Sequence, residues 1–313
     1  MRVLLIGGCG FLGSHVADSL LAHGHQVRIL DRRPEAFRPP LATVDYMLGD
    51  FGDRATLEAA VDGVDAIMHL ASTTVPQTAN LDPVADIEGN LIGTVRMLEL
   101  LRTRPVRKFV YLSSGGTVYG VPQSDLVDEK HPLQPISCYG IVKVAVENYL
   151  YHEHVLHGLN HVVLRASNPY GPRQGGIGIQ GIIGTHLWKV ARHEPMEIWG
   201  DGTVVRDFIH VADLAELSVA ALQSDATGSF NAGSGVGTSV NAIASAIEEV
   251  VSRDHWPRPP IIYKPGRPYD VPRIVLNVTQ ARETFGWTPG ITLDRGLEDS
   301  WAWVREQSGF EKR

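Results

Sequence analysis

The chain has 313 residues, a formal net charge of -7, and 43% hydrophobic and 20% charged residues, which is the composition of a globular protein with a large core. The negative charge and the lack of any run of lysines and arginines argue against nucleic acid or an anionic membrane as a partner, because both bind through dense positive charge. We expect a cytoplasmic protein, since no apolar stretch approaches the roughly 20 residues that span a bilayer and no signal-peptide layout is present. We also expect reduced thiols, because Cys9 and Cys138 are too few for a disulfide framework.

Short runs rich in valine, isoleucine and leucine alternate with amphipathic segments through the first half of the chain. These runs predict strands at residues 2–6, 26–30, 66–70, 108–112 and 161–164. Strands that alternate with helices form a parallel sheet covered on both faces. The pattern therefore predicts an α/β fold with a Rossmann-type, doubly wound sheet.

The pattern changes from about residue 168, where glycine- and proline-rich loops separate isolated helices. We expect helices at residues 211–223, 239–251 and 292–306. The chain thus divides into a first domain, residues 1–167, and a smaller mixed α/β lobe, residues 168–313. Some segments of this second part are expected to return to the first domain.

A glycine motif, Gly7-x-x-Gly10-x-x-Gly13, follows the first strand and contains Phe11 and Leu12. Glycine suits this turn because the backbone must approach a pyrophosphate, whose charge is met by backbone N–H groups and the helix dipole. The motif predicts a dinucleotide site. A glycine-rich turn without a ligand is the alternative.

Asp31 ends the second predicted strand, about 20 residues beyond the glycine turn, where a carboxylate accepts hydrogen bonds from the adenosine ribose. Because it would repel a 2′-phosphate, Asp31 favours NAD over NADP. The adjacent Arg32 and Arg33 keep NADP open, and a loop-capping role for Asp31 needs no ligand at all.

Tyr139 and Lys143 form a Tyr-x-x-x-Lys pair at the start of a helix predicted over residues 139–156, so they share one helical face. A tyrosine acts as a base near neutral pH only if its phenolate is stabilised, and a neighbouring ammonium and a nicotinium ring supply that field. The strand before this helix leads into Ser113, Ser114 and Thr117. One of these hydroxyls can contact the reacting sugar oxygen opposite the tyrosine.

Together these motifs resemble the NAD-dependent epimerase/dehydratase family of extended short-chain dehydrogenases/reductases, and within it the UDP-sugar 4-epimerases. The resemblance covers essentially the whole chain. Besides the glycine motif, Asp31, the serines and the Tyr-Lys pair, it includes Asp50-Phe51, His69-Leu70-Ala71, Asn90, Asn168-Pro169-Tyr170-Gly171-Pro172, Gly200-Asp201-Gly202, Arg206-Asp207-Phe208-Ile209-His210-Val211 and Gly266-Arg267-Pro268-Tyr269-Asp270.

The resemblance implies a role for each matching position. Tyr139 would be the acid/base, Lys143 would bind the nicotinamide ribose, and Ser114 would face the sugar 4-oxygen. The cofactor groove would contain Asp50, Phe51, Leu70, Ala71 and Asn90. The nucleotide diphosphate would be held by Asn168, Arg206 and Arg267, with Asp270 near its ribose. Two guanidiniums suit a pyrophosphate because each can bind it through two hydrogen bonds.

The hydroxyl assignment departs from the family pattern. The family places its catalytic serine or threonine four residues before the motif tyrosine, and here the position four before Tyr119 is Gly115. Ser114 stands 25 residues before Tyr139, the separation that the resemblance implies for the catalytic pair. We therefore predict Ser114 as the catalytic hydroxyl, with Thr117 and Ser113 as alternatives.

The sequence favours epimerisation at sugar C4. Dehydratases of the family carry an Asp-Glu pair after the catalytic threonine, and decarboxylases carry a nearby glutamate, whereas this chain has Gly115-Gly116-Thr117. Without an acid to expel a hydroxyl, an oxidised sugar has one simple outcome, reduction on its other face. The alternatives are an NAD(P)H-dependent reductase of a carbonyl or 4-keto sugar and a non-catalytic dinucleotide-sensing protein, which Tyr139 and Lys143 disfavour.

Three further expectations concern metal, assembly and sugar size. We expect no metal site at His152, His154, His157 and His161, because Gly158 ends the helix between the last two. Apolar positions in residues 91–101 and 142–150 form either a homodimer seam, as the resemblance implies, or a face buried against the sheet. The resemblance also places Ile274, seven residues after Arg267, at the sugar pocket. Because relatives restricted to the non-acetylated sugar have tyrosine there, we expect a UDP-sugar substrate that includes the N-acetylated pair.

Overall fold

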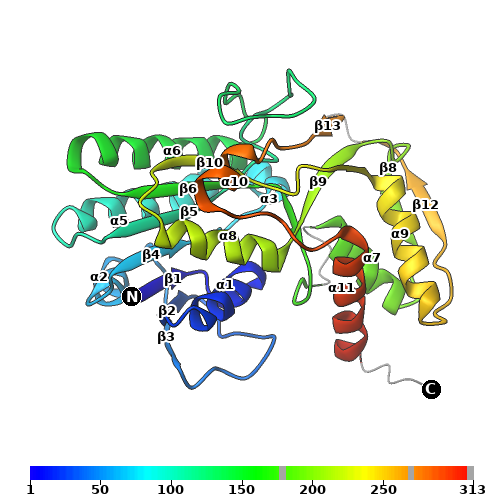
Figure 1. Ribbon diagram of the computed structural model, residues 1–313, viewed down its shortest axis with the longest axis horizontal. Helices are drawn as coiled ribbons and strands as arrows, with labels where there is room; N and C mark the ends of the chain where they lie inside the picture. Colours follow the sequence, from blue (N-terminus) through cyan, green and yellow to red (C-terminus); the bar gives the residue numbers. More distant parts are fainter. Residues whose placement is uncertain (176–180, 267–270, 309–313) are drawn as a thin grey trace.

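The computed structural model describes residues 1–175, 181–266 and 271–308. Its central sheet has seven strands, all parallel, in the order β10-β6-β5-β4-β1-β2-β3 (Figure 1). These strands are β1 (Arg2–Ile6), β2 (Gln26–Asp31), β3 (Val44–Leu48), β4 (Ala66–His69), β5 (Lys108–Ser114), β6 (His161–Ala166) and β10 (Gly228–Ala232). The predicted Rossmann-type sheet is confirmed.

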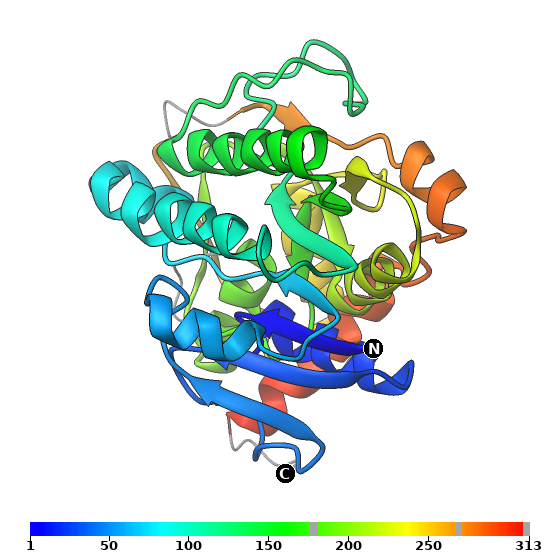
Figure 2. The same ribbon diagram turned by 90° about the vertical axis from the view of Figure 1, so that its left-hand side faces the viewer.

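Helices bury both faces of this sheet, which is why its central strands read as continuous apolar runs. One face packs against α1 (Phe11–Ala22), α8 (Val211–Gln223) and α10 (Thr279–Phe285). The other packs against α2 (Arg54–Val61), α5 (Gly93–Leu101) and α6 (Cys138–His157), which lie together in Figure 2 in blue, cyan and green. Two short helices, α3 (Pro76–Leu81) and α4 (Pro83–Asp86), lead into a π-helical turn, η1 (Ile87–Ile92), before α5.

The smaller lobe has its own apolar core around the buried Trp301. Its helices are α7 (Ile182–Ala191), α9 (Val240–Arg253) and α11 (Leu293–Gln307). Strand β9 (Val205–His210) pairs with β7 (Asn168–Tyr170), β11 (Gly237–Ser239) and β13 (Arg273–Ile274), while β8 (Met196–Trp199) pairs with β12 (Ile261–Lys264). Figure 1 places α7, α9 and α11 together at the end of the molecule opposite α2 and α5.

Segments from the second half of the chain complete the first lobe. Helix α8 packs against α1, and β10 adds to the sheet beside β6. Strands β3 and β10 were not predicted from the sequence. Within the described residues, no helix combines the length and the apolar character needed to cross a bilayer.

Candidate active site

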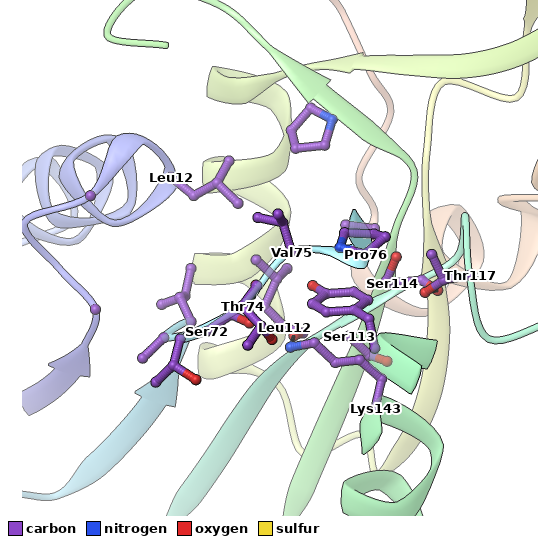
Figure 3. A pocket seen from close by; sticks show the side chains of 18 of the residues that line it. Leu12, Ser72, Thr74, Val75, Pro76, Leu112, Ser113, Ser114, Thr117 and Lys143 are labelled. Atoms are coloured by element: carbon purple, nitrogen blue, oxygen red, sulfur yellow. Dashed lines mark hydrogen bonds between the residues drawn. The ribbon is translucent and has the colours of Figure 1, made fainter. Parts of the chain in front are cut away.

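A cleft of about 810 Å³ lies at the carboxyl ends of β1, β2, β4 and β5. The glycine turn, the segment after β4 and the start of α6 all contribute to its lining. Figure 3 shows Leu12 from the glycine turn on one side and Ser114 and Thr117 together on another, with Lys143 reaching up from α6. Open parallel sheets bind their ligands at this edge, so the fold places the candidate residues where a ligand is expected.

The glycine turn is close-packed against its neighbours. Gly7 has φ +84, and a Cβ there would lie 2.7 Å from the backbone nitrogen of Ala71. A Cβ at Gly13 would lie 2.2 Å from the carbonyl oxygen of Gly7. Gly10 lines the cleft at the N-terminus of α1, and its Cβ would meet no atom closer than 3.6 Å. Gly10 therefore leaves open a position beside exposed helix N–H groups, which fits a cofactor pyrophosphate.

Asp31 lines the cleft at the end of β2. Its Oδ2 accepts a hydrogen bond from the backbone nitrogen of Cys9 at 3.0 Å, and its Oδ1 accepts one from the backbone nitrogen of Arg33 at 3.2 Å. Arg32 also lines the cleft, but its guanidinium lies 3.9 Å from the carboxylate of Asp50. The carboxylate of Asp31 is thus fixed at the turn, where it fits the ribose of NAD.

The other predicted cofactor residues divide into two groups. Phe11, Leu12, Phe51, Leu70 and Ala71 line the cleft. Asp50 is exposed outside the lining and accepts a hydrogen bond from the backbone nitrogen of Gly52. Asn90 is buried behind the wall, where its amide oxygen accepts from the backbone nitrogen of Thr73 at 2.8 Å. The expectation that Asn90 lines the groove is corrected, because the π-helical turn η1 holds it one layer deeper.

Tyr139 and Lys143 lie on the first turns of α6, with the Lys143 ammonium 5.5 Å from the centre of the Tyr139 ring. Lys143 is 5% exposed, and its Nζ donates to the carbonyl oxygen of Leu112 at 2.9 Å. Burial lowers the pKa of Lys143 to about 8, against the opposing effect of Glu147 and Asp86. Burial raises the pKa of Tyr139 to about 12, although a hydrogen bond with Ser72 lowers it. The tyrosine therefore needs a nearby positive charge to work as a base.

The three candidate hydroxyls differ in their availability. The Ser113 Oγ is buried and donates to the Glu147 carboxylate at 2.5 Å. Ser113, Ser114 and Thr117 all line the cleft, but only the Ser113 hydroxyl is taken up by a carboxylate. Thr117 Oγ1 lies 3.5 Å from the carbonyl oxygen of Ser114 (Figure 3). The geometry leaves Ser114 and Thr117 as the hydroxyls that can reach a ligand.

The predicted nucleotide residues lie farther along the same cleft. Asn168 lines it and donates to the carbonyl oxygen of Asp207 at 2.9 Å. Arg206 also lines it, and its guanidinium donates to the carbonyl oxygen of Val271 at 2.6 Å. Arg267 and Asp270 lie outside the described residues.

Ile274 is not placed as the sequence suggested. It is 3% exposed on β13, where it packs in an apolar cluster with Val118, Tyr119, Val127 and Leu276. It is absent from the cleft lining formed by the described residues. The expectation that Ile274 lines a sugar pocket is corrected, because its side chain is buried in this apolar cluster.

A second cavity of about 200 Å³ adjoins the cleft and was not expected from the sequence. Asn168, Gln174, Gly181 and Arg206 line both spaces. The remaining walls are mainly apolar or aromatic, and include Tyr170, Ile183, Trp199, Phe208 and Val240. These positions come together only in the folded smaller lobe, where β7 pairs with β9. No local motif in the sequence therefore indicates the cavity.

The histidines at the end of α6 surround a carboxylate. Glu153 is buried and paired with Arg102, while His152 and His157 approach it at 3.2 and 3.9 Å. Among the residues that the structure describes, no group of three or more His, Cys, Asp and Glu side chains is arranged to hold a metal. Both cysteines are free thiols.

Comparison with known proteins gives consistent matches over this architecture. Residues 3–233 match the NAD dependent epimerase/dehydratase family. The chain is 33% identical over 309 residues to a putative UDP-glucose 4-epimerase of Methanocaldococcus jannaschii, covering 98% of this chain and 99% of that protein. The structure resembles UDP-glucose 4-epimerase of Thermotoga maritima, solved with UDP-glucose, with a TM-score of 0.92 at 31% identity and coverage of 98% and 99%. It also resembles the Thermus thermophilus enzyme of that name in complex with NAD, with a TM-score of 0.90 at 33% identity and coverage of 97% and 99%.

Proposed function

Because this chain belongs to the NAD-dependent epimerase/dehydratase family and is an NAD-dependent UDP-sugar 4-epimerase, we propose that it inverts C4 of a UDP-hexose through a transient 4-keto sugar. One observation supports this reaction above all others. Tyr139, Lys143 and Ser114 line the same cleft as the glycine turn and Asp31. A proton acceptor, a cation and a hydroxyl thus lie beside a dinucleotide site.

The roles of the chain's own groups follow from their positions. NAD, which the glycine turn and Asp31 would hold, would supply the hydride acceptor and donor for oxidation at sugar C4 and reduction on the opposite face. The Tyr139 oxygen takes the proton of the C4 hydroxyl as the carbonyl forms, and gives it back when the carbonyl is reduced. The Lys143 ammonium stabilises the phenolate, and the Ser114 hydroxyl donates to the sugar oxygen. Hydride and proton are both returned, so the reaction has no net redox change.

The nucleotide portion is assigned to the part of the cleft formed by the smaller lobe. Asn168 and Arg206 would contact the diphosphate, together with Arg267, and Asp270 would lie near the ribose. The adjoining cavity, with Trp199 and Phe208 in its wall, has the flat apolar character that suits a pyrimidine ring. A guanidinium between the two spaces is well placed to bind a diphosphate that joins base and sugar.

For the sugar, we assign both the glucose/galactose pair and the N-acetylated pair. The cleft lining includes several short side chains, among them Ser72, Thr73 and Thr74, and it includes Gly116. Such a wall leaves room for a 2-acetamido group.

The test is incubation of the purified protein with UDP-glucose, UDP-galactose and their N-acetylated counterparts, followed by NMR. We expect C4 epimers without added cofactor and release of NAD, rather than NADP, on denaturation. An NADPH requirement with a reduced sugar as product would support the reductase alternative and overturn the proposal.

We further assign a homodimer built on α6 and the segment before α5. The positions Val142, Val146 and Leu150 on α6 are buried within the subunit and are not available for a seam. Ile141 and Tyr149 of α6 are exposed instead, as are several apolar residues of the preceding segment, Leu81, Val84, Ile87 and Ile92. Exposed apolar surface of this kind is typical of an interface. Light scattering should give about twice the 34.2 kDa of one chain, and a monomer would exclude the assignment.

A further inference from the structure

A buried carboxylate lies directly behind the catalytic pair. Glu147 stands on α6 one helical turn after Lys143 and is 5% exposed. Its Oε1 accepts the hydroxyl hydrogen of Ser113 at 2.5 Å. Its Oε2 accepts from Nε and Nη2 of Arg165 on β6, at 3.1 and 2.7 Å. One side chain therefore ties the catalytic helix to the ends of two neighbouring strands.

The connection continues beneath the segment that carries the candidate hydroxyls. Arg165 Nη1 donates to the Tyr119 hydroxyl at 3.0 Å and to the carbonyl oxygen of Glu129 at 3.3 Å. Tyr119 is fully buried, and its hydroxyl donates to the amide oxygen of Asn231 on β10 at 2.6 Å. Ser114 and Thr117 thus lie between Ser113 and Tyr119, and both of these flanking residues are fixed by this buried network.

We propose that Glu147 is a positioning residue, which sets the distance between the hydroxyls after β5 and the Tyr139–Lys143 pair and provides the counter-charge for the Lys143 ammonium. This inference rests on the proposed function. The buried network would act through geometry, since a displacement of about 1 Å in a reacting group can cost about a hundredfold in rate. It would also act through charge, because a carboxylate one turn away favours the protonated lysine.

The surroundings of Lys143 show why one carboxylate matters. Glu147 on the same helix and Asp86 at the end of α4 raise the pKa of Lys143, while burial lowers it to about 8. Its other titratable neighbours are His69 on β4, Tyr111 on β5 and Tyr139, and burial lowers the pKa of His69 to about 3. Loss of the Glu147 charge should therefore lower the pKa of Lys143. The ammonium would then be lost at lower pH, so the alkaline limb of activity would move toward neutral pH.

The same helix supplies a matched control. Glu153 is also buried, and it also accepts two hydrogen bonds from one arginine, from Arg102 Nε at 3.0 Å and Nη2 at 2.6 Å. It lies near the far end of α6, away from the cleft lining. Both substitutions, Glu147→Gln and Glu153→Gln, remove a buried carboxylate from an ion pair, and Glu147→Gln should lower stability more, because Arg165 is buried and Arg102 is partly exposed. Only Glu147→Gln should alter catalysis.

The experiment measures kcat, KM and the pH profile of UDP-sugar epimerisation for wild type and both variants. For Glu147→Gln we expect kcat to fall about tenfold to about a hundredfold, with KM within about twofold and an alkaline limb at lower pH. Ser113→Ala keeps the Glu147–Arg165 ion pair and removes only the hydrogen bond between Glu147 and β5. It should lower kcat about threefold to about tenfold without moving the alkaline limb of the pH profile. This variant replaces Glu147→Gln in the test if Glu147→Gln does not fold. A Glu147→Gln or Ser113→Ala variant that behaves like Glu153→Gln would overturn the inference, whereas an inactive wild type would overturn the proposed function instead.

Discussion

At the scale of single residues, the proposed mechanism depends on Tyr139. Burial raises the pKa of Tyr139 to about 12, so its phenol stays protonated near neutral pH unless positive charge lies close to it. Lys143 supplies one such charge, and a bound nicotinium would supply another.

Replacement of Tyr139 by phenylalanine removes the proton acceptor and keeps the ring packing. We expect turnover to fall at least about a hundredfold, the lower range for loss of a general acid or base. NAD content, measured after denaturation, should stay at the wild-type level. Near-normal epimerisation by Tyr139→Phe would exclude the assigned mechanism.

Ser114 and Thr117 can be separated by the same approach. Both line the cleft, but Ser114 stands directly at the end of β5, whereas Thr117 follows two glycines. We expect the kcat of Ser114→Ala to be at least about tenfold lower than that of Thr117→Ala, because a fixed donor stabilises the reacting oxygen better than a displaced one. If steady-state kinetics show the larger loss for Thr117→Ala, the hydroxyl assignment passes to Thr117.

At the scale of the element, the glycine turn has a packing role, and we propose that it also binds the cofactor. Gly13→Ala would place a Cβ 2.2 Å from a backbone oxygen, so it should lower both the melting temperature and the NAD content. Gly10→Ala places its Cβ in open space at the cleft, so it should lower NAD content with little change in melting temperature. Equal NAD content in Gly10→Ala and wild type would argue against a pyrophosphate at this turn.

The elements also show what the sequence could and could not predict. The central strands were recognisable because burial on both faces makes them apolar throughout. The edge strand β3, Val-Asp-Tyr-Met-Leu, is only partly buried, and β10, Gly-Ser-Phe-Asn-Ala, becomes a strand through its pairing with β6. Neither has a local pattern strong enough to predict it.

The candidate site shows the same division between local and tertiary information. Adjacent motifs predicted the glycine turn and the Tyr139–Lys143 pair, because each is confined to a few consecutive residues of the chain. The sequence favoured Ser114 by its spacing but could not exclude Ser113, since the carboxylate that binds Ser113 lies 34 residues away. It also misplaced Ile274, because spacing from Arg267 does not reveal which face of β13 points inward.

At the scale of the whole molecule, both lobes contribute to the cleft, and we propose that the wall with Gly116 selects between sugar substrates. Gly116 lines the cleft, and a Cβ at this position would meet no atom within 4 Å. A larger side chain can therefore enter the cleft without disturbing the protein around it. Unlike Ile274, which is buried, Gly116 is therefore the position at which we test the proposed sugar site.

We expect Gly116→Val to lower kcat/KM for the N-acetylated pair at least about tenfold more than for the glucose/galactose pair, because rejection of a bulkier substituent by a narrowed pocket has about this size. Melting temperature and NAD content should match those of the wild type, which separates a steric effect on the substrate from damage to the fold. Ile274→Tyr is the matched comparison: overpacking of a buried cluster should cost about 1 to 3 kcal/mol of stability and leave the substrate preference unchanged. Equal losses for both sugar pairs in Gly116→Val would show that the acetamido group lies elsewhere, and a shift in preference by Ile274→Tyr would show that β13 reaches the sugar after all.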